Sequence, residues 1–232
     1  MRASGILLPV SSLPGKYGIG SFSEEAYKFV DFLKDSKQQY WQILPIGPTS
    51  YGDSPYQSFS TYAGNPYFIS LEELIEQKLL TEKECDKVDF GDKIDKVDYE
   101  KLYNGRFKLL KKAYKRSNIR EREEFKKFKD ENQYWLNDYA MFMAIKERFK
   151  GQSFDNWAED IKLRWGYSME YYQNELKEEI EFYEFVQYEF YRQWYKLKKY
   201  ANDNGVKIIG DIPIYVAYDS ADVWSHPELF QI

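Results

Sequence analysis

Three short apolar runs limit what this chain can fold into. They cover residues 5–10, 40–46 and 206–212, and each leads into a loop punctuated by Gly, Pro or Ser. None alternates cleanly between apolar and polar residues, which is typical of strands covered on both faces of a parallel sheet. The chain is therefore predicted to be an α/β protein built around a buried parallel sheet.

A helix is predicted between the first two runs. Ser23 is placed to cap its N-terminus, and Glu24 and Glu25 lie in the first turn, where the helix dipole favours negative charge. An apolar stripe at helical spacing follows, made of Ala26, Phe29, Val30 and Leu33. Strand, helix and strand in this order predict a βαβ unit with a right-handed crossover.

The long stretch between the second and third runs is predicted to be mostly helical. Helices are expected over 71–80, with Ser70 as N-cap, and over 99–114, 133–149 and 169–201. The last of them ends at an Asn-Asp-Asn-Gly segment in which Gly205 suits a left-handed cap. Its apolar stripe consists of Tyr183, Val186, Phe190, Trp194 and Leu197. The mixed charges of 120–131 indicate a solvated helix face.

The number of residues suggests how these parts combine. A (β/α)8 barrel takes about 250 residues, and a βα unit takes about 30. With roughly 130 residues in the helical stretch, roughly 100 remain, enough for about three such units. We therefore expect the N-terminal portion of a TIM barrel with a large inserted helical subdomain. The expected division is 1–70 for the first barrel strands and a substrate loop, 71–204 for the helical insertion, and 205–232 for the third strand and its loop.

The amino-acid composition favours some classes of function and argues against others. Aromatic residues make up 19% of the chain, more than a core needs. Excess Tyr and Trp suit either the packing of amphipathic helices or stacking on the apolar faces of sugars or bases. The net charge of -5 argues against a nucleic-acid surface. A single cysteine and a single histidine exclude an internal disulfide and a His/Cys zinc site.

The expected location is the cytoplasm. No apolar run is long enough to cross a membrane, and the N-terminal one is too short for a signal peptide. One cysteine fits a reducing compartment. We therefore expect a soluble protein without membrane contact.

The segment after the second apolar run has the densest set of binding groups. Residues 46–60 and 63–66 combine tyrosines with Ser, Gln and Asn side chains at the C-terminal end of the predicted strand, where barrel active sites are built. Aromatic faces beside hydroxyl and amide groups suit a carbohydrate. An ordinary Gly/Pro/Ser-rich turn region with packing tyrosines is the alternative interpretation.

Asp211 is the candidate carboxylate of the third predicted strand. It lies at the end of the apolar run, where it could hold sugar hydroxyls or face an oxocarbenium-like charge. A turn aspartate that accepts backbone N–H bonds is an equal alternative.

Other reactive residue types favour structural roles. His226 precedes Pro227 and is interpreted as a loop histidine before a short helix. Cys85 lies in a polar stretch without a nearby histidine, which favours a structural or incidental thiol. Five aspartates recur every third residue over 86–98 but lack the ligand order of an EF-hand, so a solvated face is favoured.

Several blocks of the sequence together resemble one family. They are GILLPVSSLPG at 5–15, YGIG at 17–20, WQILPIGPT at 41–49, DSPYQSFS at 53–60, AGNP at 63–66, GDIPIYVA at 210–217 and DSADVW at 219–224. These blocks, in this order, are similar to those of the 4-α-glucanotransferases, also called amylomaltases or disproportionating enzymes. The resemblance extends from Gly5 to Phe230.

The resemblance implies an α-amylase-clan barrel enzyme with inserted subdomains and no metal or organic cofactor. Such an enzyme cuts an α-1,4-glucan and passes the glucanosyl unit to the 4-hydroxyl of another sugar. The implied mechanism is retaining, with an aspartate nucleophile, a glutamate acid/base and a second aspartate that holds sugar hydroxyls. In the family these three lie on later strands, so no catalytic residue is expected in this chain and all three are expected downstream of Ile232.

Four residues of this chain match supporting positions of the family. Tyr56 matches a tyrosine that stacks near the donor sugar, and Ser54 lies beside it. Asp211 matches the aspartate of the first barrel signature after the third strand, and Tyr51 matches a tyrosine linked to a secondary glucan site. The expected ligands are maltooligosaccharides or other α-1,4-glucans.

Two other functions remain open at this point. The same aromatics could serve a non-catalytic glucan-binding module, or the helical stripes could dock a protein partner. The first hypothesis is the N-terminal part of a 4-α-glucanotransferase, which by itself would be inactive.

Overall fold

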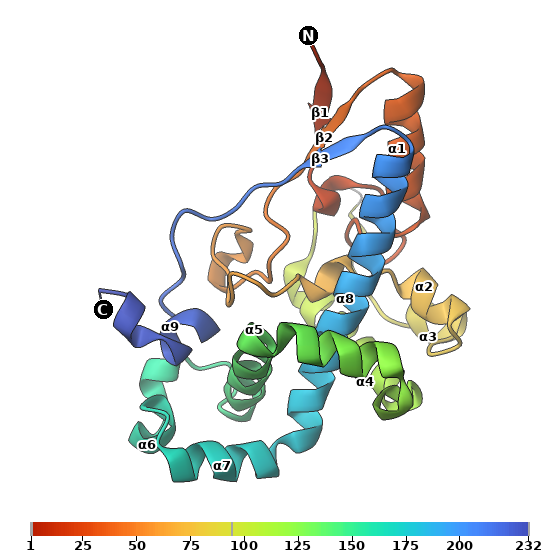
Figure 1. The fold of residues 1–232 in the computed structure, drawn as a ribbon. Coiled ribbons are helices and arrows are strands. Elements are labelled where there is room, and N and C mark those ends of the chain that lie inside the picture. Colours follow the sequence, from red (N-terminus) through yellow and green to blue (C-terminus); the bar gives the residue numbers. More distant parts are fainter. Residues whose placement is uncertain (1, 94, 232) are drawn as a thin grey trace. The chain divides into compact units, whose positions relative to one another are not determined.

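The chain folds into two compact units, drawn together in Figure 1. The structure is a computed structural model that describes residues 2–93 and 95–231, the side chain of Tyr51 excepted. Unit 1 comprises residues 1–46, 65–118 and 189–212, and unit 2 comprises 47–64, 119–188 and 213–232. Each unit is described by itself below.

A parallel three-stranded sheet forms part of unit 1. Strands β1 (Gly5–Leu7), β2 (Tyr40–Gln42) and β3 (Lys207–Ile209) lie in the order β1-β2-β3 (Figure 1). Gly5 pairs with Tyr40, which pairs with Lys207, and both pairings are parallel. The three predicted strands and their parallel direction are confirmed, although each strand is shorter than its apolar run.

The expectation that both faces of every strand are buried is wrong for the described chain. Trp41, at the centre of the sheet, is fully buried, but Leu7 and Ile209 are exposed at 54% and 43%. Because neighbouring side chains along a strand point to opposite faces, Leu7, Gln42 and Ile209 share the open face. The other face carries Trp41, whose ring packs edge-on against Phe29 at 5.1 Å.

Helix α1 (Glu24–Asp35) connects β1 to β2 as predicted. Ala26, Val30 and Leu33 are fully buried, which confirms the apolar stripe. Ser23 occupies the N-cap position, but its side chain makes no capping bond and its buried Oγ has no hydrogen-bond partner among the described atoms. The cap position was predictable from spacing, whereas the rotation of the hydroxyl depends on packing.

Further helices make up most of the chain between β2 and β3. Their bounds are α2 (Leu71–Glu76), α3 (Glu82–Asp86), α4 (Tyr99–Arg116), α5 (Glu123–Arg148), α6 (Glu159–Lys162), α7 (Gly166–Glu175), α8 (Lys177–Asp203) and, after β3, α9 (Ala221–Ser225). The Ser70 hydroxyl accepts the Glu73 N–H at 3.2 Å, which confirms it as the cap of α2. Gly205 adopts a φ of 78°, the left-handed conformation expected after α8.

The largest differences between the predicted helix boundaries and the structure are at three places. Helix α2 ends at Glu76, and Lys78 then takes a φ of 61°, which stops the helix short of residue 80. Helix α5 begins ten residues before the predicted 133, because the charged segment is itself helical and buries Phe125. The predicted helix 169–201 is divided at the buried Leu176, whose φ/ψ of -107°/24° separates α7 from α8.

Candidate functional site

The candidate ligand loop, residues 47–64, is a hairpin-like segment of unit 2. Thr49 and Ser58 form an antiparallel bridge, and the Ser50 N–H donates to the Gln57 carbonyl at 2.9 Å. Between them a short 3-10 turn spans Tyr51–Asp53, where Gly52 has a φ of 80°. The chain thus reverses at 51–56 and presents this tip at the end of two paired arms.

Tyr56 and Ser54 lie together at the tip. The Tyr56 side chain is 46% exposed, and its backbone N–H donates to the Ser54 hydroxyl oxygen at 3.3 Å. A ring that is half open to solvent can lie against the apolar face of a ligand while nearby hydroxyl and amide groups bind its polar rim. The side chain of Tyr51, also predicted for this site, lies outside the described part of the structure.

Two buried serines make the base of the loop rigid. The Ser58 hydroxyl donates to the Ser60 carbonyl at 2.7 Å and accepts the Ser60 N–H at 3.2 Å. The Ser60 hydroxyl oxygen accepts the N–H groups of Tyr62 and Ala63 at 3.1 and 3.2 Å. These bonds satisfy backbone donors that neither helix nor sheet satisfies here, and they hold the base of the loop.

Gln187 of α8 holds the end of the loop by two hydrogen bonds. Its Oε1 accepts the Gly64 N–H at 2.7 Å, and its Nε2 donates to the Gly64 carbonyl at 3.0 Å. Gln187 is fully buried. Gln187 was not among the residues predicted for the site, although its position beside the buried stripe residue Val186 is a sequence signal for a buried polar side chain.

Replacing Gln187 with methionine is expected to destabilise unit 2 by about 2–3 kcal/mol, because two buried backbone groups would lose their partners. Hydrogen exchange of peptides covering residues 61–66 measures this directly. Gln133→Met on the exposed side of α5 is the matched control and should change exchange little. Unchanged exchange in Gln187→Met would contradict an anchoring role.

Asp222 of α9 provides a second anchor. Its Oδ2 accepts the Thr61 N–H at 2.9 Å, and the Ala221 N–H donates to the Phe59 carbonyl at 2.8 Å. Burial raises the pKa of the Asp222 carboxyl, which the bond from Thr61 partly opposes. The DSADVW segment noted in the sequence therefore serves in unit 2 as a brace for the ligand loop.

A buried ion pair connects the same 219–224 segment to α5. The Lys146 ammonium lies 2.5 Å from Asp219 Oδ2, and the other oxygen of Asp219 accepts the Phe154 N–H at 3.2 Å. The ammonium also lies 5.0 Å from the centre of the Phe59 ring. Lys146 thus connects α5, the segment before α9 and the ligand loop at one point.

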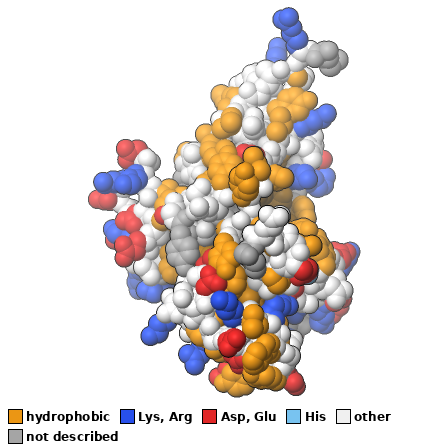
Figure 2. All heavy atoms as spheres, turned by 90° about the vertical axis from the view of Figure 1, so that its left-hand side faces the viewer, with side chains coloured by type: hydrophobic (Ala, Val, Ile, Leu, Met, Phe, Trp, Pro, Cys, Tyr) orange, Lys and Arg blue, Asp and Glu red, His pale blue; other side chains and the backbone are white. Residues whose placement is uncertain are grey.

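Asp211 lies in unit 1, two residues beyond β3, and is exposed. Its Oδ1 accepts the N–H of the adjacent Ile212 at 2.9 Å, which is the backbone contact expected of a turn aspartate. The segment that follows is strongly exposed, with Ile214 at 90% and Tyr215 at 84%. Exposed apolar side chains are also visible on the face drawn in Figure 2.

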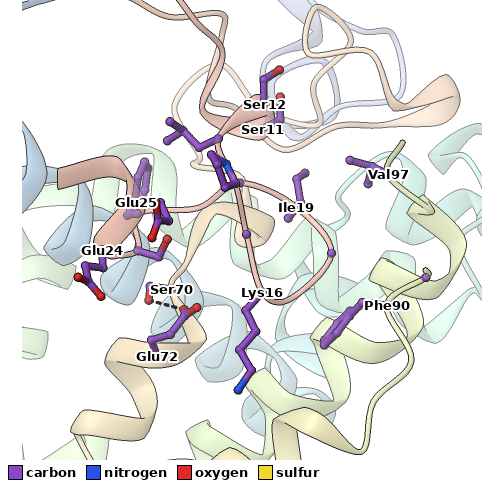
Figure 3. A pocket seen from close by; sticks show the side chains of 18 of the residues that line it. Ser11, Ser12, Lys16, Ile19, Glu24, Glu25, Ser70, Glu72, Phe90 and Val97 are labelled. Carbon is purple, nitrogen blue, oxygen red and sulfur yellow. Dashed lines mark hydrogen bonds between the residues drawn. The ribbon is translucent and has the colours of Figure 1, made fainter. Parts of the chain in front are cut away.

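Unit 1 contains a separate cavity of about 1160 Å³, shown in Figure 3. Side chains from the loop after β1, the start of α1, α2 and the segment before α4 line it. Glu72 points toward Ser70, whose hydroxyl donates to it at 2.8 Å, while Lys16 pairs with Glu82 and Asp86 at 2.7 and 3.0 Å. Because its lining mixes both charge signs, the cavity does not indicate a ligand class.

The other reactive side chains have structural surroundings. Cys85 is buried, which raises the pKa of its thiol to about 11, so the thiolate needed for nucleophilic chemistry is disfavoured at neutral pH. His226 lies 3.3 Å from Glu228 before the 3-10 turn Pro227–Leu229.

Within residues 2–93 and 95–231, no cluster of His, Cys, Asp and Glu could hold a metal ion. Among these residues there is also no helix long and apolar enough to span a membrane.

Comparisons with known proteins give consistent matches. The family model described as 4-alpha-glucanotransferase matches residues 8–232. A 4-alpha-glucanotransferase of Clostridium butyricum is 52% identical over 95% of this chain and 45% of its own length, and one of Streptococcus pneumoniae is 51% identical over 99% and 46%. The chain therefore spans about half the length of the curated relatives it matches.

Solved structures agree with these matches. An amylomaltase from Streptococcus agalactiae, solved in complex with acarbose, superposes with a TM-score of 0.95 at 44% identity, over all of this chain and 47% of that one. An amylomaltase from Corynebacterium glutamicum shares the fold at 21% identity and a TM-score of 0.73, over 97% of this chain and 32% of that one.

Proposed function

Because the chain belongs to the 4-alpha-glucanotransferase family, we propose that it is the N-terminal part of an enzyme that transfers a segment of a 1,4-α-glucan to the 4-hydroxyl of an acceptor sugar. The observation that carries the proposal is the family match over residues 8–232. The structural agreement with the amylomaltase that binds acarbose supports the same ligand class, maltooligosaccharides and related glucans.

We propose that the three parallel strands are the first strands of a (β/α)8 barrel. Their order and common direction are those of consecutive barrel strands. The open sheet face with Leu7 and Ile209 is then the face that the barrel interior covers. In this arrangement the ligand loop and Asp211 follow the carboxyl ends of β2 and β3, where barrel enzymes bind their substrates.

The proposed reaction is a double displacement that retains the anomeric configuration. An aspartate forms a covalent glycosyl-enzyme, and a glutamate first protonates the leaving oxygen and then deprotonates the acceptor hydroxyl. Both residues, and the second aspartate, are proposed to lie in the sequence beyond Ile232. No metal or organic cofactor enters this scheme, because the two carboxyl groups supply the acid, the base and the nucleophile.

The proposed role of this chain is to bind and orient the donor glucan. Tyr56 stacks on a donor sugar ring, and the Ser54 hydroxyl lies beside it at the loop tip. Asp211 accepts sugar hydroxyls, and Tyr51 contributes to a secondary glucan site. Support for these roles is the exposure of Tyr56 and Asp211 together with the hydrogen bonds that fix the loop base.

The test uses the full-length protein and maltotriose. Transfer predicts glucose together with maltooligosaccharides longer than the substrate. Binding of the glucan without turnover would instead favour the non-catalytic glucan-binding module. If the protein neither binds nor converts glucans, the remaining hypothesis of a helical interaction protein would replace the proposal.

In the full-length protein, Tyr56→Ala is expected to lower kcat/KM for transfer roughly fivefold, because a lost stacking contact costs about 1 kcal/mol. If the contact tightens as the sugar distorts, part of the loss appears in kcat. The melting temperature should change little, since the ring is half exposed and its removal leaves no large cavity. Tyr195→Ala, at an exposed tyrosine of α8, is the matched control. A large drop in melting temperature with unchanged kinetics would show that Tyr56 is a packing residue.

A further inference from the structure

Helix α7 and its N-cap residue, Trp165, expose aromatic rings that the proposed transfer site does not use. Trp165, Tyr167 and Tyr171, here called the aromatic row, are 44%, 63% and 58% exposed. Tyr167 and Tyr171 are one helical turn apart, and with Glu170 and Asn174 they follow the i, i+3, i+4, i+7 spacing of a single helix face. The helix is labelled in Figure 1.

This face has a hollow lined by both aromatic and polar side chains. The hollow measures about 500 Å³ and is lined by Tyr167, Glu170, Tyr171, Asn174 and Glu175. The Asn174 amide donates to the Glu170 carbonyl at 2.9 Å, which leaves its side-chain oxygen available as an acceptor. Aromatic faces beside acceptor groups are the combination that binds a sugar with apolar C–H faces and hydroxyl donors.

The charges on this face favour a neutral ligand. Among the described residues, neither Glu170 nor Glu175 has a cation within ion-pair distance. The cations before α7 are already engaged, Lys162 with Asp155 at 3.2 Å and Arg164 with Asp138 at 2.6 Å. A negative face repels nucleic acids and anionic lipids, whereas carboxylates accept hydrogen bonds from the hydroxyls of a neutral polyol.

The rings are held on a fixed support, which lowers the entropic cost of binding. The buried Ser168 hydroxyl donates to Asp160 Oδ2 at 2.5 Å and ties α7 to α6. Tyr172 contacts Phe149, the residue that follows α5, with ring centres 6.3 Å apart, and meets Tyr171 edge-on at 5.2 Å. Trp165 meets Tyr167 at 5.9 Å.

We propose that the aromatic row of α7 is a further α-glucan-binding surface, distinct from the secondary site proposed for Tyr51, which holds a long glucan chain during transfer. Successive sugar rings lie against Tyr171 and Tyr167, which are four residues, about 6 Å, apart along the helix axis. Glu170, Asn174 and Glu175 accept hydroxyl donors along the edge of the bound chain. This inference rests on the proposed function in one respect, namely that the ligand is an α-glucan.

The test compares long and short glucans in the full-length protein. Tyr167→Ala/Tyr171→Ala is expected to weaken amylose binding and raise KM for amylose roughly twenty-fivefold, since two stacking contacts are lost, each worth about fivefold. The kinetics with maltotriose should not change, because so short a substrate occupies the transfer site alone. Tyr167→Phe/Tyr171→Phe keeps the ring faces and should retain most of the binding, and Tyr195→Ala should match the unaltered protein.

A second measurement does not depend on the variants. Amylose should slow hydrogen exchange of residues 166–175 in the unaltered protein, and maltotriose should not. Unaltered amylose binding in the double alanine variant, or exchange of α7 that amylose does not change, would overturn the proposal. A variant that loses maltotriose turnover as severely as amylose turnover would also overturn it, because the row would then belong to the transfer site or the fold.

The two proposals fail in different ways. If the unaltered protein transfers maltotriose but substitutions in the aromatic row do not change amylose binding, the proposal of a glucan-binding surface on α7 is wrong and the proposed transferase function stands. If no transfer occurs but the row still determines amylose binding, the surface stands and the enzyme function is wrong. Selective binding of a basic peptide to α7, without glucan binding, would identify a protein-docking face instead.

Discussion

Replacing Lys146 with methionine is expected to destabilise the fold around the ligand loop by about 3–5 kcal/mol, the usual cost of removing one partner of a buried ion pair. Methionine keeps most of the side-chain volume beside the rings of Phe59 and Phe142. What it removes is the charge opposite Asp219, whose side chain is only 12% exposed. The expected loss of stability is therefore caused by the unpaired charge of Asp219 and not by a cavity.

Hydrogen exchange and thermal unfolding of the full-length protein measure this effect. The amides of residues 152–154 and 219–222 should lose most protection, because Asp219 accepts the Phe154 N–H and precedes the brace for Phe59. Lys127→Met makes the same substitution on the exposed surface of the same helix, where Lys127 lies 3.7 Å from Glu131, and should change little. Equal effects of the two substitutions would contradict the anchoring role of Lys146.

Asp219→Asn completes the comparison. It leaves the buried ammonium without its counter-charge and should also be strongly destabilising. Combined with Lys146→Met, it should cost clearly less than the sum of the two single substitutions, since the second change removes a charge that the first left unpaired. Additive losses would show that the two side chains do not act as a pair.

A polypeptide limited to residues 1–232 is expected to release no glucose from maltotriose. Glycosyl transfer of this type needs a nucleophilic carboxylate and an acid/base on opposite sides of the scissile bond. In the proposed enzyme both lie beyond Ile232, and the chain spans only about half the length of its curated relatives. The open sheet face with Leu7 and Ile209 would also be left exposed to solvent.

The measurement is a glucose-release assay on a pure, mass-verified sample, with the full-length protein as positive control. Far-ultraviolet circular dichroism shows whether the shortened polypeptide is folded, so that inactivity and unfolding are told apart. Glucose release above background by the folded polypeptide would place a complete catalytic set within these 232 residues and overturn the proposed division of roles.

Features that depend on neighbouring residues could be predicted from the sequence. The three strands, α1 and the stop of α8 at Gly205 all follow from apolar spacing, capping residues and the conformational freedom of glycine. The matched blocks also identified the family, because a series of motifs in fixed order carries far more information than any one of them.

Element boundaries were less predictable where packing competes with local preference. The break at Leu176 falls inside a continuous helical pattern, and the buried leucine there marks the point at which one helix becomes two. Likewise, the apolar runs indicated strands covered on both faces, whereas Leu7 and Ile209 are exposed in the sheet of unit 1. Periodicity records which residues favour burial, but not which surfaces are available to bury them.

The loop that includes Tyr56 was predictable as a binding segment, but what holds it in place was not. Gln187, Lys146 and Asp222 make their anchoring contacts with Gly64, Asp219 and Thr61, which lie 123, 73 and 161 residues away in sequence. A side chain's local pattern cannot reveal a partner that only folding brings within hydrogen-bond distance. The sequence by itself thus determined the approximate elements, the family and the loop of Tyr56 as a binding candidate, while the tertiary structure decided which aromatic rings are exposed and which buried polar groups meet to hold the loop.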